Sequence, residues 1–446
     1  MANNLTKGTV WKQIFRFALP MLIGNVFQQL YNLTDSVIVG NYLGKRALAA
    51  VGASFPIIFL LISLIIGVAM GATIMVSQFY GAKQRRNILL TNSTLMIFLL
   101  VSAIIISIIG IYFTEQIFLL INLPADLLPQ AVSYLQVYLL GLVFFFGYNG
   151  VSAILRGLGD SKTPLYFLII STVLNIILDL FFVIVLKWGI EGTAIATIIS
   201  QATAFLFAII YLRKRGEILE FSFGRFKFDT KIFKQMLKIG IPSGLQATLV
   251  SLGMMAILSV VNGFGTDVVA AYSAAFRIDA LATLPAMNFA AALSTFVGQN
   301  LGASMMERIK KAYKATLIMS SIFSVMVTII IYFFGNNLMG IFTSDANVIR
   351  IGVEYLVIVS SFYIVFSAMF STNAIMRGAG DTMVTLLISL IALWIVRVPT
   401  AYFLSQYMGE TGIWWSWPAG IVIGLILSYS YYKTGRWKKK VIIDKK

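Results

Sequence analysis

The sequence predicts an all-α membrane protein with twelve transmembrane helices in two parallel six-helix repeats, an N-lobe and a C-lobe, around a central cavity. Composition, the spacing of apolar segments and an internal duplication each support this fold class. Of the 446 residues, 59% are hydrophobic and only 11% are charged, whereas soluble domains carry about 25% charged residues. So little charge cannot cover a protein surface in water, which excludes a soluble enzyme, a disordered scaffold and a secreted module.

Twelve apolar segments follow one another along the chain, each long enough for the ~20 helical residues that cross a bilayer. Lys and Arg gather in alternate loops, so the net charge of +17 indicates membrane topology rather than nucleic-acid binding. Because cytoplasmic loops are the basic ones, both termini are expected in the cytoplasm. The abundance of Ile, Lys, Phe and Asn is typical of AT-rich bacterial genomes and favours a bacterial cytoplasmic membrane. The predicted spans are residues 15–40, 50–78, 88–112, 130–154, 164–186, 192–212, 236–262, 270–298, 314–334, 350–376, 383–407 and 412–432.

The two halves of the chain are duplicates. VGNYLG at 39–44 matches VVNGFG at 260–265, VSQFYGA at 76–82 matches VGQNLGA at 297–303, and RGLGDSK at 156–162 matches RGAGDTM at 377–383, always at an offset of 221 residues. Each repeat has six spans, so both enter the membrane from the same side, as parallel repeats with a binding cavity between them.

This duplication predicts the domain boundaries. The expected parts are an N-lobe at 1–213, a basic cytoplasmic linker at 214–235, a C-lobe at 236–434 and a basic cytoplasmic tail at 435–446.

The first span carries a polar stripe at helical spacing. Unsatisfied polar groups in hydrocarbon cost several kcal/mol each, so the stripe cannot face lipid. It either forms a hydrogen-bonded seam between helices or lines a wet cavity, and the carboxylate of Asp35 favours the cavity. The stripe consists of Asn25, Gln28, Gln29, Asn32, Asp35 and Ser36. Further candidates for the substrate cavity are Gln246, Met254, Met255 and Met287, although methionines in so apolar a chain are more often ordinary packing.

The fifth and sixth spans carry a second polar group. Asn175 and Asp179 lie one turn apart on one helix face, as do Thr193 and Thr197. A charged side chain at mid-membrane costs about 3 kcal/mol and marks a functional site by default. A buried ion pair is the structural alternative, but the first six spans hold no Lys or Arg away from their ends. The carboxylates therefore either hold a proton or bind a cation such as Na⁺, with Asn175 and Thr197 as neutral oxygen donors.

The second half lacks this acidic group but has charges of its own. By the same offset, Asp35, Asn175 and Asp179 align with Ala256, Val396 and Thr400. Arg277 and Asp279 are secondary site candidates that would neutralise each other locally. Arg397, just before Pro399, would satisfy carbonyls freed at a kink.

Other features indicate structure or exclude chemistry. The chain has neither Cys nor His, so thiolate sites and imidazole proton carriers are excluded. No Walker-type phosphate loop is present, so the chain is not expected to hydrolyse ATP itself. We expect a protein that is not an enzyme and that needs no cofactor besides H⁺ or Na⁺ as the ion that its carboxylates hold. Pro20, Pro56, Pro242, Pro285 and Pro399 are expected to bend or start helices, and the RGxGD loops with Arg156, Asp160, Arg377 and Asp381 are expected to act structurally.

These features together resemble the multidrug and toxic compound extrusion (MATE) family over nearly the whole chain. The resemblance rests on the paired VSQFYGA/VGQNLGA and RGLGDSK/RGAGDTM segments, the first-span carboxylate and the fifth-span N-x-x-x-D. It implies a multidrug efflux antiporter that exports amphipathic, mostly cationic organic compounds in exchange for H⁺ or Na⁺. It also implies a cation site at Asp35, Asn175, Asp179 and Thr197, bordered by Tyr138. A carrier of this layout is expected to work as a monomer, with membrane lipid around it.

The chain departs from the NorM-like branch of that family. It has no acid in span seven, and span ten has only Glu354 near its outer end, so it is more similar to the DinF-like branch. A flippase for lipid-linked saccharides is the alternative function, but it needs cavity arginines for a pyrophosphate. Only Arg277 and Arg397 fit that need. A channel is a third, weaker alternative.

Overall fold

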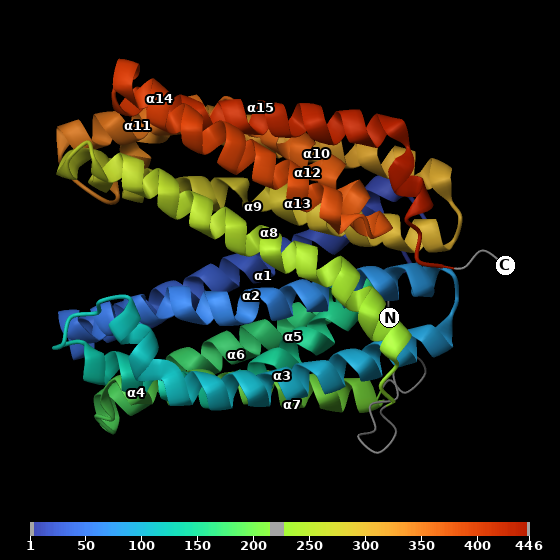
Figure 1. The fold of residues 1–446 in the computed structure, drawn as a ribbon, viewed down its shortest axis with the longest axis horizontal. Coiled ribbons are helices and arrows are strands. Elements are labelled where there is room, and N and C mark those ends of the chain that lie inside the picture. Colours follow the sequence, from blue (N-terminus) through green and yellow to red (C-terminus); the bar gives the residue numbers. More distant parts are fainter. Residues whose placement is uncertain (1–3, 215–226, 444–446) are drawn as a thin grey trace. The chain divides into compact units, whose positions relative to one another are not determined.

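The computed structural model describes residues 4–214 and 227–443, and every regular element in these ranges is helical (Figure 1). The α-helices are α1 (Val10–Ile38), α2 (Lys45–Gly81), α3 (Arg85–Leu120), α4 (Leu128–Leu140), α5 (Leu142–Gly157), α6 (Lys162–Leu180), α7 (Gly189–Lys214), α8 (Thr230–Asn262), α9 (Thr266–Gly302), α10 (Met306–Gly340), α11 (Ala346–Ser360), α12 (Tyr363–Ala379), α13 (Thr382–Leu390), α14 (Val398–Met408) and α15 (Glu410–Thr434). Three short π-helices, η1 (Val39–Leu43), η2 (Phe181–Val185) and η4 (Ile391–Arg397), and the 3₁₀ turn η5 (Arg436–Lys439) complete the described elements.

The membrane spans agree with the expected pattern. Across the described ranges, nine helices are long and apolar enough to cross a bilayer, and two bent pairs, α4–α5 and α11–α12, each make one more. α1 occupies the remaining predicted position but is less apolar, because its polar stripe interrupts the hydrophobic sequence. The predicted all-α, twelve-helix fold class is confirmed.

The two sharp bends occur where no proline lies. The α4–α5 pair bends by 49° at Gly141, and the α11–α12 pair bends by 48° at residues 361–362. Pro20, Pro56, Pro242 and Pro285, by contrast, lie inside continuous helices. Of these five prolines, Pro399 alone occupies the first turn of a helix, α14.

The chain divides into two compact units whose limits differ from the predicted lobes. Unit 1 contains Ile23–Gly244, and unit 2 contains Asn4–Leu22 together with Leu245–Lys446. The divisions fall inside α1 and α8, so each of these helices begins in one unit and ends in the other. Of the predicted linker at 214–235, residues 215–226 lie outside the described residues, and residues 230–235 form the first turns of α8.

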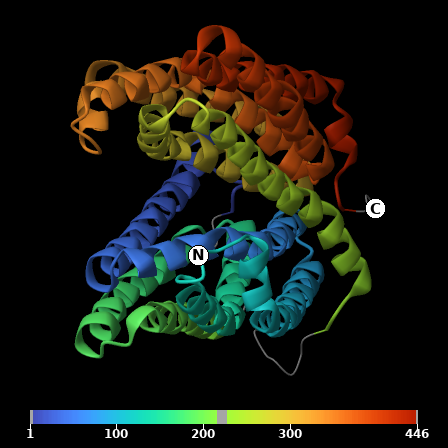
Figure 2. The ribbon, with the colours of Figure 1, turned by 60° about the vertical axis from the view of Figure 1, so that its left-hand side comes forward.

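Glycines explain why the first half of α8 belongs to unit 1. A Cβ added to Gly67 of α2 would come within 2.4 Å of the backbone nitrogen of Gly244, and one added to Gly240 would come within 2.5 Å of the Cα of Val68. Gly71 and Gly240 face each other similarly. Small residues four apart on each helix thus let the two backbones touch. α8 itself, yellow-green in the views, runs as one unbroken helix (Figure 1, Figure 2).

The N-terminal segment belongs to unit 2 for a different reason. Leu5 is fully buried, its N–H donates to Gln299 Oε1 at 3.0 Å, and its carbonyl accepts from Arg308 at 3.1 Å. Phe17 of α1 lies in the same apolar core. The VGQNLGA segment of α9 therefore anchors the start of the chain. The predicted tail is also anchored, since Trp437 is only 2% exposed.

Candidate functional site

Asp35 lies near the end of α1, in unit 1, and is only 5% exposed. The polar stripe of α1 is graded: Asn25 and Gln29 are exposed, whereas Gln28 and Asn32 are half-buried. The helical spacing thus turns the carboxylate inward at the end of the stripe, among the other helices of unit 1.

Asn175 and Asp179 lie on α6, and both side chains are fully buried. Asp179 is within electrostatic reach of Asp35. Asp35 Oδ1, both carboxylate oxygens of Asp179 and both amide atoms of Asn175 are buried without a hydrogen-bond partner. Among the described residues, no ion pair involves either acid. The structure therefore brings the predicted acids together and provides no protein cation for them.

The hydroxyl groups around these acids come from α1, α4 and α7. Tyr31 and Thr197 share a hydrogen bond of 2.9 Å between their hydroxyl oxygens. Thr193 is buried, but it donates to the carbonyl of Ile190 at 2.9 Å in its own helix. Thr197 is thus hydrogen-bonded to α1 one turn away from Asp35, while Thr193 donates its hydroxyl proton within α7.

Two tyrosines of α4 also lie near the acids. Tyr134 and Tyr138 stack with ring centroids 6.3 Å apart, and both interact electrostatically with Asp35. Sequence reasoning named Tyr138 but missed Tyr31 and Tyr134. Helical spacing contained the signal for both, because Tyr31 lies four residues before Asp35 and Tyr134 four before Tyr138.

Two π-helices lie next to the acids. η1 begins four residues after Asp35, and η2 begins two residues after Asp179. The two segments contact each other, and both contact α7. π-helical turns are rare and occur frequently at functional sites. η1 and η2 thus place a locally widened backbone directly after the helices that carry Asp35 and Asp179.

The arrangement suits a proton or a hard cation. An uncompensated buried carboxylate is strongly unfavourable, and two within electrostatic reach are more so. Asn175, Thr197 and the carboxylates themselves offer amide, hydroxyl and carboxyl oxygens as ligand atoms. In the described part of the chain, no cluster of three or more acidic, His or Cys side chains is present, so nothing here resembles a transition-metal site.

Unit 2 corrects two expectations about its charges. Arg277 is exposed and Asp279 is 6% exposed, and no ion pair joins them among the described residues. Asp279 instead accepts hydrogen bonds from Tyr363 and Tyr355. Within the described ranges, Arg397 makes no hydrogen bond to a freed carbonyl, and its Nε is buried without a partner. Arg277 and Asp279 do not pair because they are two residues apart, about 200° around the helix, and therefore point in different directions.

The family model MatE matches residues 20–181 and again 242–403, once in each repeat. The chain belongs to the MATE family. Since this is a family of transporters, the chain is a multi-pass membrane transporter and not an enzyme.

Individual members of the MATE family align along nearly the whole chain. "Probable multidrug resistance protein YoeA" of Bacillus subtilis is 34% identical, with 98% of this chain and 96% of the relative covered. "Probable multidrug resistance protein NorM" of Thermotoga maritima is 27% identical, covering 97% and 94%. A crystal structure described as MATE in the bent conformation superposes with a TM-score of 0.91 at 26% identity, covering 98% of both chains.

The remaining candidates for a substrate cavity in this MATE chain lie in unit 2. Gln246 Nε2 donates to Ser389 Oγ at 2.6 Å, whereas Met254, Met255 and Met287 are 36%, 61% and 44% exposed. Asn25, Gln28, Gln29 and Asn32 belong to unit 1. Their convergence on one cavity stays a prediction.

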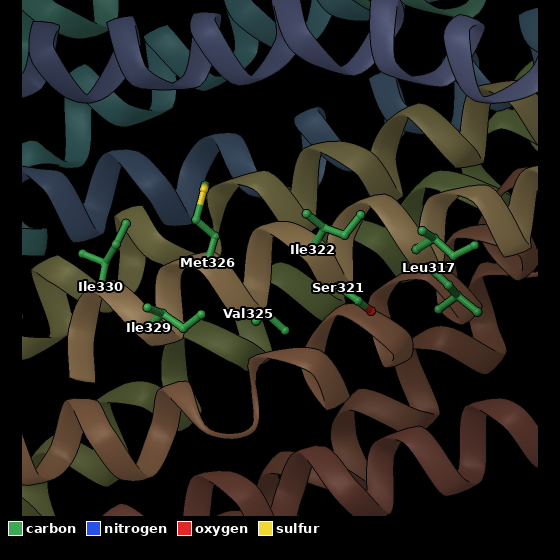
Figure 3. A pocket seen from close by; sticks show the side chains of 8 residues that line it. Leu317, Ser321, Ile322, Val325, Met326, Ile329 and Ile330 are labelled. Atoms are coloured by element: carbon green, nitrogen blue, oxygen red, sulfur yellow. The ribbon is translucent and has the colours of Figure 1, made fainter. Parts of the chain in front are cut away.

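An open groove of about 720 Å³ on α10 is a poor candidate for the transport site. Figure 3 shows its lining, which is apolar apart from Ser321 and runs along one helix face from Leu317 to Ile330. It offers no charge and no convergent polar groups. Such a surface fits the acyl chains of the surrounding bilayer, as expected for a spanning helix of this MATE chain.

Proposed function

We propose that this chain is a secondary active antiporter that exports amphipathic, mostly cationic organic compounds in exchange for H⁺ or Na⁺ by alternating access. The observation that carries the proposal is the buried pair Asp35 and Asp179, in which Asp35 Oδ1 and both carboxylate oxygens of Asp179 lack a hydrogen-bond partner. The relatives named as multidrug resistance proteins support the substrate class.

The coupling follows from competition for one negative site. When Asp35 and Asp179 are ionised, the pair attracts an organic cation. When a proton or Na⁺ occupies the pair, that attraction is lost and the organic cation is released. Because the buried pair is costly when unoccupied, the carrier reorients mainly with one or the other cation bound. This condition makes the exchange obligatory.

The two coupling ions require different partners. Na⁺ needs several oxygen ligands, which Asp35, Asp179, Asn175 and Thr197 would supply, with Tyr138 at the border. H⁺ needs only one carboxylate. Either ion moving down a potential of ~100 mV releases about 2.3 kcal/mol, enough to support a useful gradient of exported compound.

We also propose an oligomeric state, a membrane and an orientation for the carrier. The carrier works as a monomer in a bacterial cytoplasmic membrane, with both termini in the cytoplasm. The basic loops support this orientation, and the bacterial relatives support the membrane.

Charge-neutral variants in proteoliposomes test the coupling site. Asp35→Asn and Asp179→Asn keep shape while removing the charge, so both are expected to fold and to lose ion-driven export of ethidium completely. Asp126→Asn is the matched control, because Asp126 is exposed and its ion pair is with Arg46 at 3.7 Å, also exposed. Full export by Asp35→Asn would overturn the mechanism.

Thermal unfolding of the purified protein separates the two ions. If Na⁺ is the coupling ion, added NaCl raises the Tm of the wild type relative to choline chloride, but not that of Asp179→Asn. If H⁺ is the coupling ion, NaCl does not have this effect. A lower pH then shifts the Tm of the wild type but not that of Asp179→Asn. The alternative function would be indicated if the wild-type chain exported no organic cation but rescued cells that lack a flippase for lipid-linked saccharides.

A further inference from the structure

Unit 2 contains a buried charged cluster that the cation site does not use. Asp279 on α9 accepts hydrogen bonds from Tyr363 on α12 at 2.6 Å and from Tyr355 on α11 at 3.4 Å. These tyrosines lie on the two sides of the bend between α11 and α12. Tyr355 packs edge-on against Trp414 of α15, with ring centroids 5.1 Å apart. The carboxylate is therefore held in one place by three helices and an aromatic wall.

Arg397 is the positive member of this cluster. It interacts electrostatically with Asp279, Tyr272 and Tyr355. No ion pair within 4.0 Å joins it to Asp279, and no described residue accepts a hydrogen bond from its guanidinium, whose Nε is buried. The side chain is half-buried near the middle of the span Thr382–Met408. A charged side chain at this depth faces a bundle interior or a water-filled pathway rather than lipid.

In this cluster the charge of Arg397 has a counterpart in Asp279, but its hydrogen-bond donors have no acceptor among the described residues. Asp279 balances the charge of Arg397 at a distance, but two phenols already occupy its oxygens. The donors of the guanidinium therefore remain unused in the described part of the chain. A planar guanidinium fork matches a carboxylate or phosphate with two parallel hydrogen bonds. This is a preformed position for an oxyanion and a poor one for a cation.

We propose that Arg397, the positive member of this cluster, binds an anionic group, a carboxylate or a phosphate, on the transported amphipath. This proposal rests on the proposed export function and assigns the residue that recognises the anionic part of a zwitterionic amphipath. In such a molecule the positive part meets the requirement of the export function, and the anionic part is the group that Arg397 recognises.

A pair of dyes that differ only in one carboxylate provides the test. Rhodamine 19 carries a free carboxylate, and rhodamine 6G is its ethyl ester. Dye binding to the purified full-length protein is measured by fluorescence polarisation in detergent. Arg397→Gln is expected to weaken rhodamine 19 binding relative to rhodamine 6G by about tenfold, because a charge-assisted hydrogen bond is lost. Arg397→Lys keeps the charge without the fork and should lose only part of this preference.

Arg277→Gln is the matched control, because it removes an exposed arginine of the same unit and should leave the ratio of the two affinities unaltered. Asp279→Asn should act in the opposite direction to Arg397→Gln. It removes the balancing charge, so rhodamine 19 should bind more tightly relative to rhodamine 6G. If Asp279→Asn does not fold, the comparison of Arg397→Gln with Arg277→Gln decides alone.

Equal weakening of both dyes by Arg397→Gln would overturn the proposal and indicate a structural role. A second arm adds phosphatidylglycerol to the micelles. If this lipid, and not rhodamine 19, raises the Tm in an Arg397-dependent way, the anion is a lipid headgroup and the substrate assignment is wrong. Failure of the wild type to bind or export rhodamine 6G would contradict the export function itself, while rhodamine 19 binding still tests Arg397.

Discussion

Asp160 and Asp179 are both buried aspartates of unit 1, yet their surroundings differ completely. Asp160 Oδ1 accepts from the backbone N–H groups of Lys162 and Thr163, and its Oδ2 accepts from the hydroxyls of Thr163 and Tyr211. Both oxygens of Asp179 are without partners. A buried carboxylate that already accepts several hydrogen bonds has a structural role, whereas one without partners is available to a ligand.

Unit 2 repeats the structural arrangement. Asp381, the counterpart of Asp160 in the RGxGD motif, accepts a hydrogen bond from Tyr431 at 2.6 Å. In each unit a tyrosine of the sixth span thus holds the loop before the fifth. This agrees with the expectation that these loops act structurally.

Replacing Asp160 by Ala should lower stability without removing function. The first turn of α6 would lose its acceptor, which costs about 1–2 kcal/mol. We expect a lower Tm and a lower folded yield in detergent, with export per folded molecule retained. Asp126→Ala serves as the control, because it breaks only an exposed ion pair worth about 0–1 kcal/mol. A stable but inactive Asp160→Ala protein would instead place this loop in the transport cycle.

At the scale of helices, close packing depends on residues without side chains. α2 and α8 touch through Gly67, Gly71, Gly240 and Gly244, where an added Cβ would meet backbone atoms at 2.4–2.8 Å. Backbone atoms cannot rotate away as a side chain does, so the helices would have to separate. The glycines therefore determine that the first half of α8 packs in unit 1.

Two alanine variants of α2 test this packing. Gly67→Ala should destabilise the protein by about 1–3 kcal/mol, as overpacking does. Gly52→Ala on the same helix is the matched control, because nothing lies within 4 Å of its added Cβ, and it should be neutral or slightly stabilising. The readout is Tm in detergent. Equal Tm values for the two variants would contradict the close approach.

The bent spans carry tyrosines that lie near one acid in each unit. α4 presents Tyr134 and Tyr138 near Asp35, and the α11–α12 pair presents Tyr355 and Tyr363 to Asp279. Tyr134 and Tyr355 correspond by the 221-residue offset. Each unit therefore surrounds one acid with tyrosines of its bent fourth span, although the acid comes from the first span in unit 1 and from the second in unit 2.

At the scale of the whole molecule, the charge distribution predicts the orientation in the membrane. Basic residues mark the cytoplasmic loops, so we expect the start of α8 on the inside and the loop between α10 and α11 on the outside. The chain has no natural cysteine, so single cysteines can be introduced without a background signal.

Labelling with a membrane-impermeant maleimide tests this orientation. Ser344 and Lys227 are both exposed. In intact cells Ser344→Cys should react, and Lys227→Cys should react only after permeabilisation. The cysteine-free parent is the control for both. The reverse pattern would overturn the orientation and with it the direction of coupling.

Much of the fold and part of the site are predictable from sequence because they depend on local properties. Apolar length determines a span, charge bias its orientation, and repeat spacing the duplication. Helical spacing put Asn175 and Asp179 on one face, and the absence of nearby basic residues indicated that they had no protein partner. Each of these features is contained within one helix or one loop.

Only the tertiary structure decided which distant residues meet. Tyr363 lies 84 residues from Asp279, yet it bonds to that carboxylate, while the nearby Arg277 does not. Likewise, Gly244 contacts Gly67 and thereby moves the unit boundary into the middle of α8. Periodicity specifies the face of a helix on which a side chain lies. The helix that packs against that face depends on close packing between remote segments, which no local pattern contains.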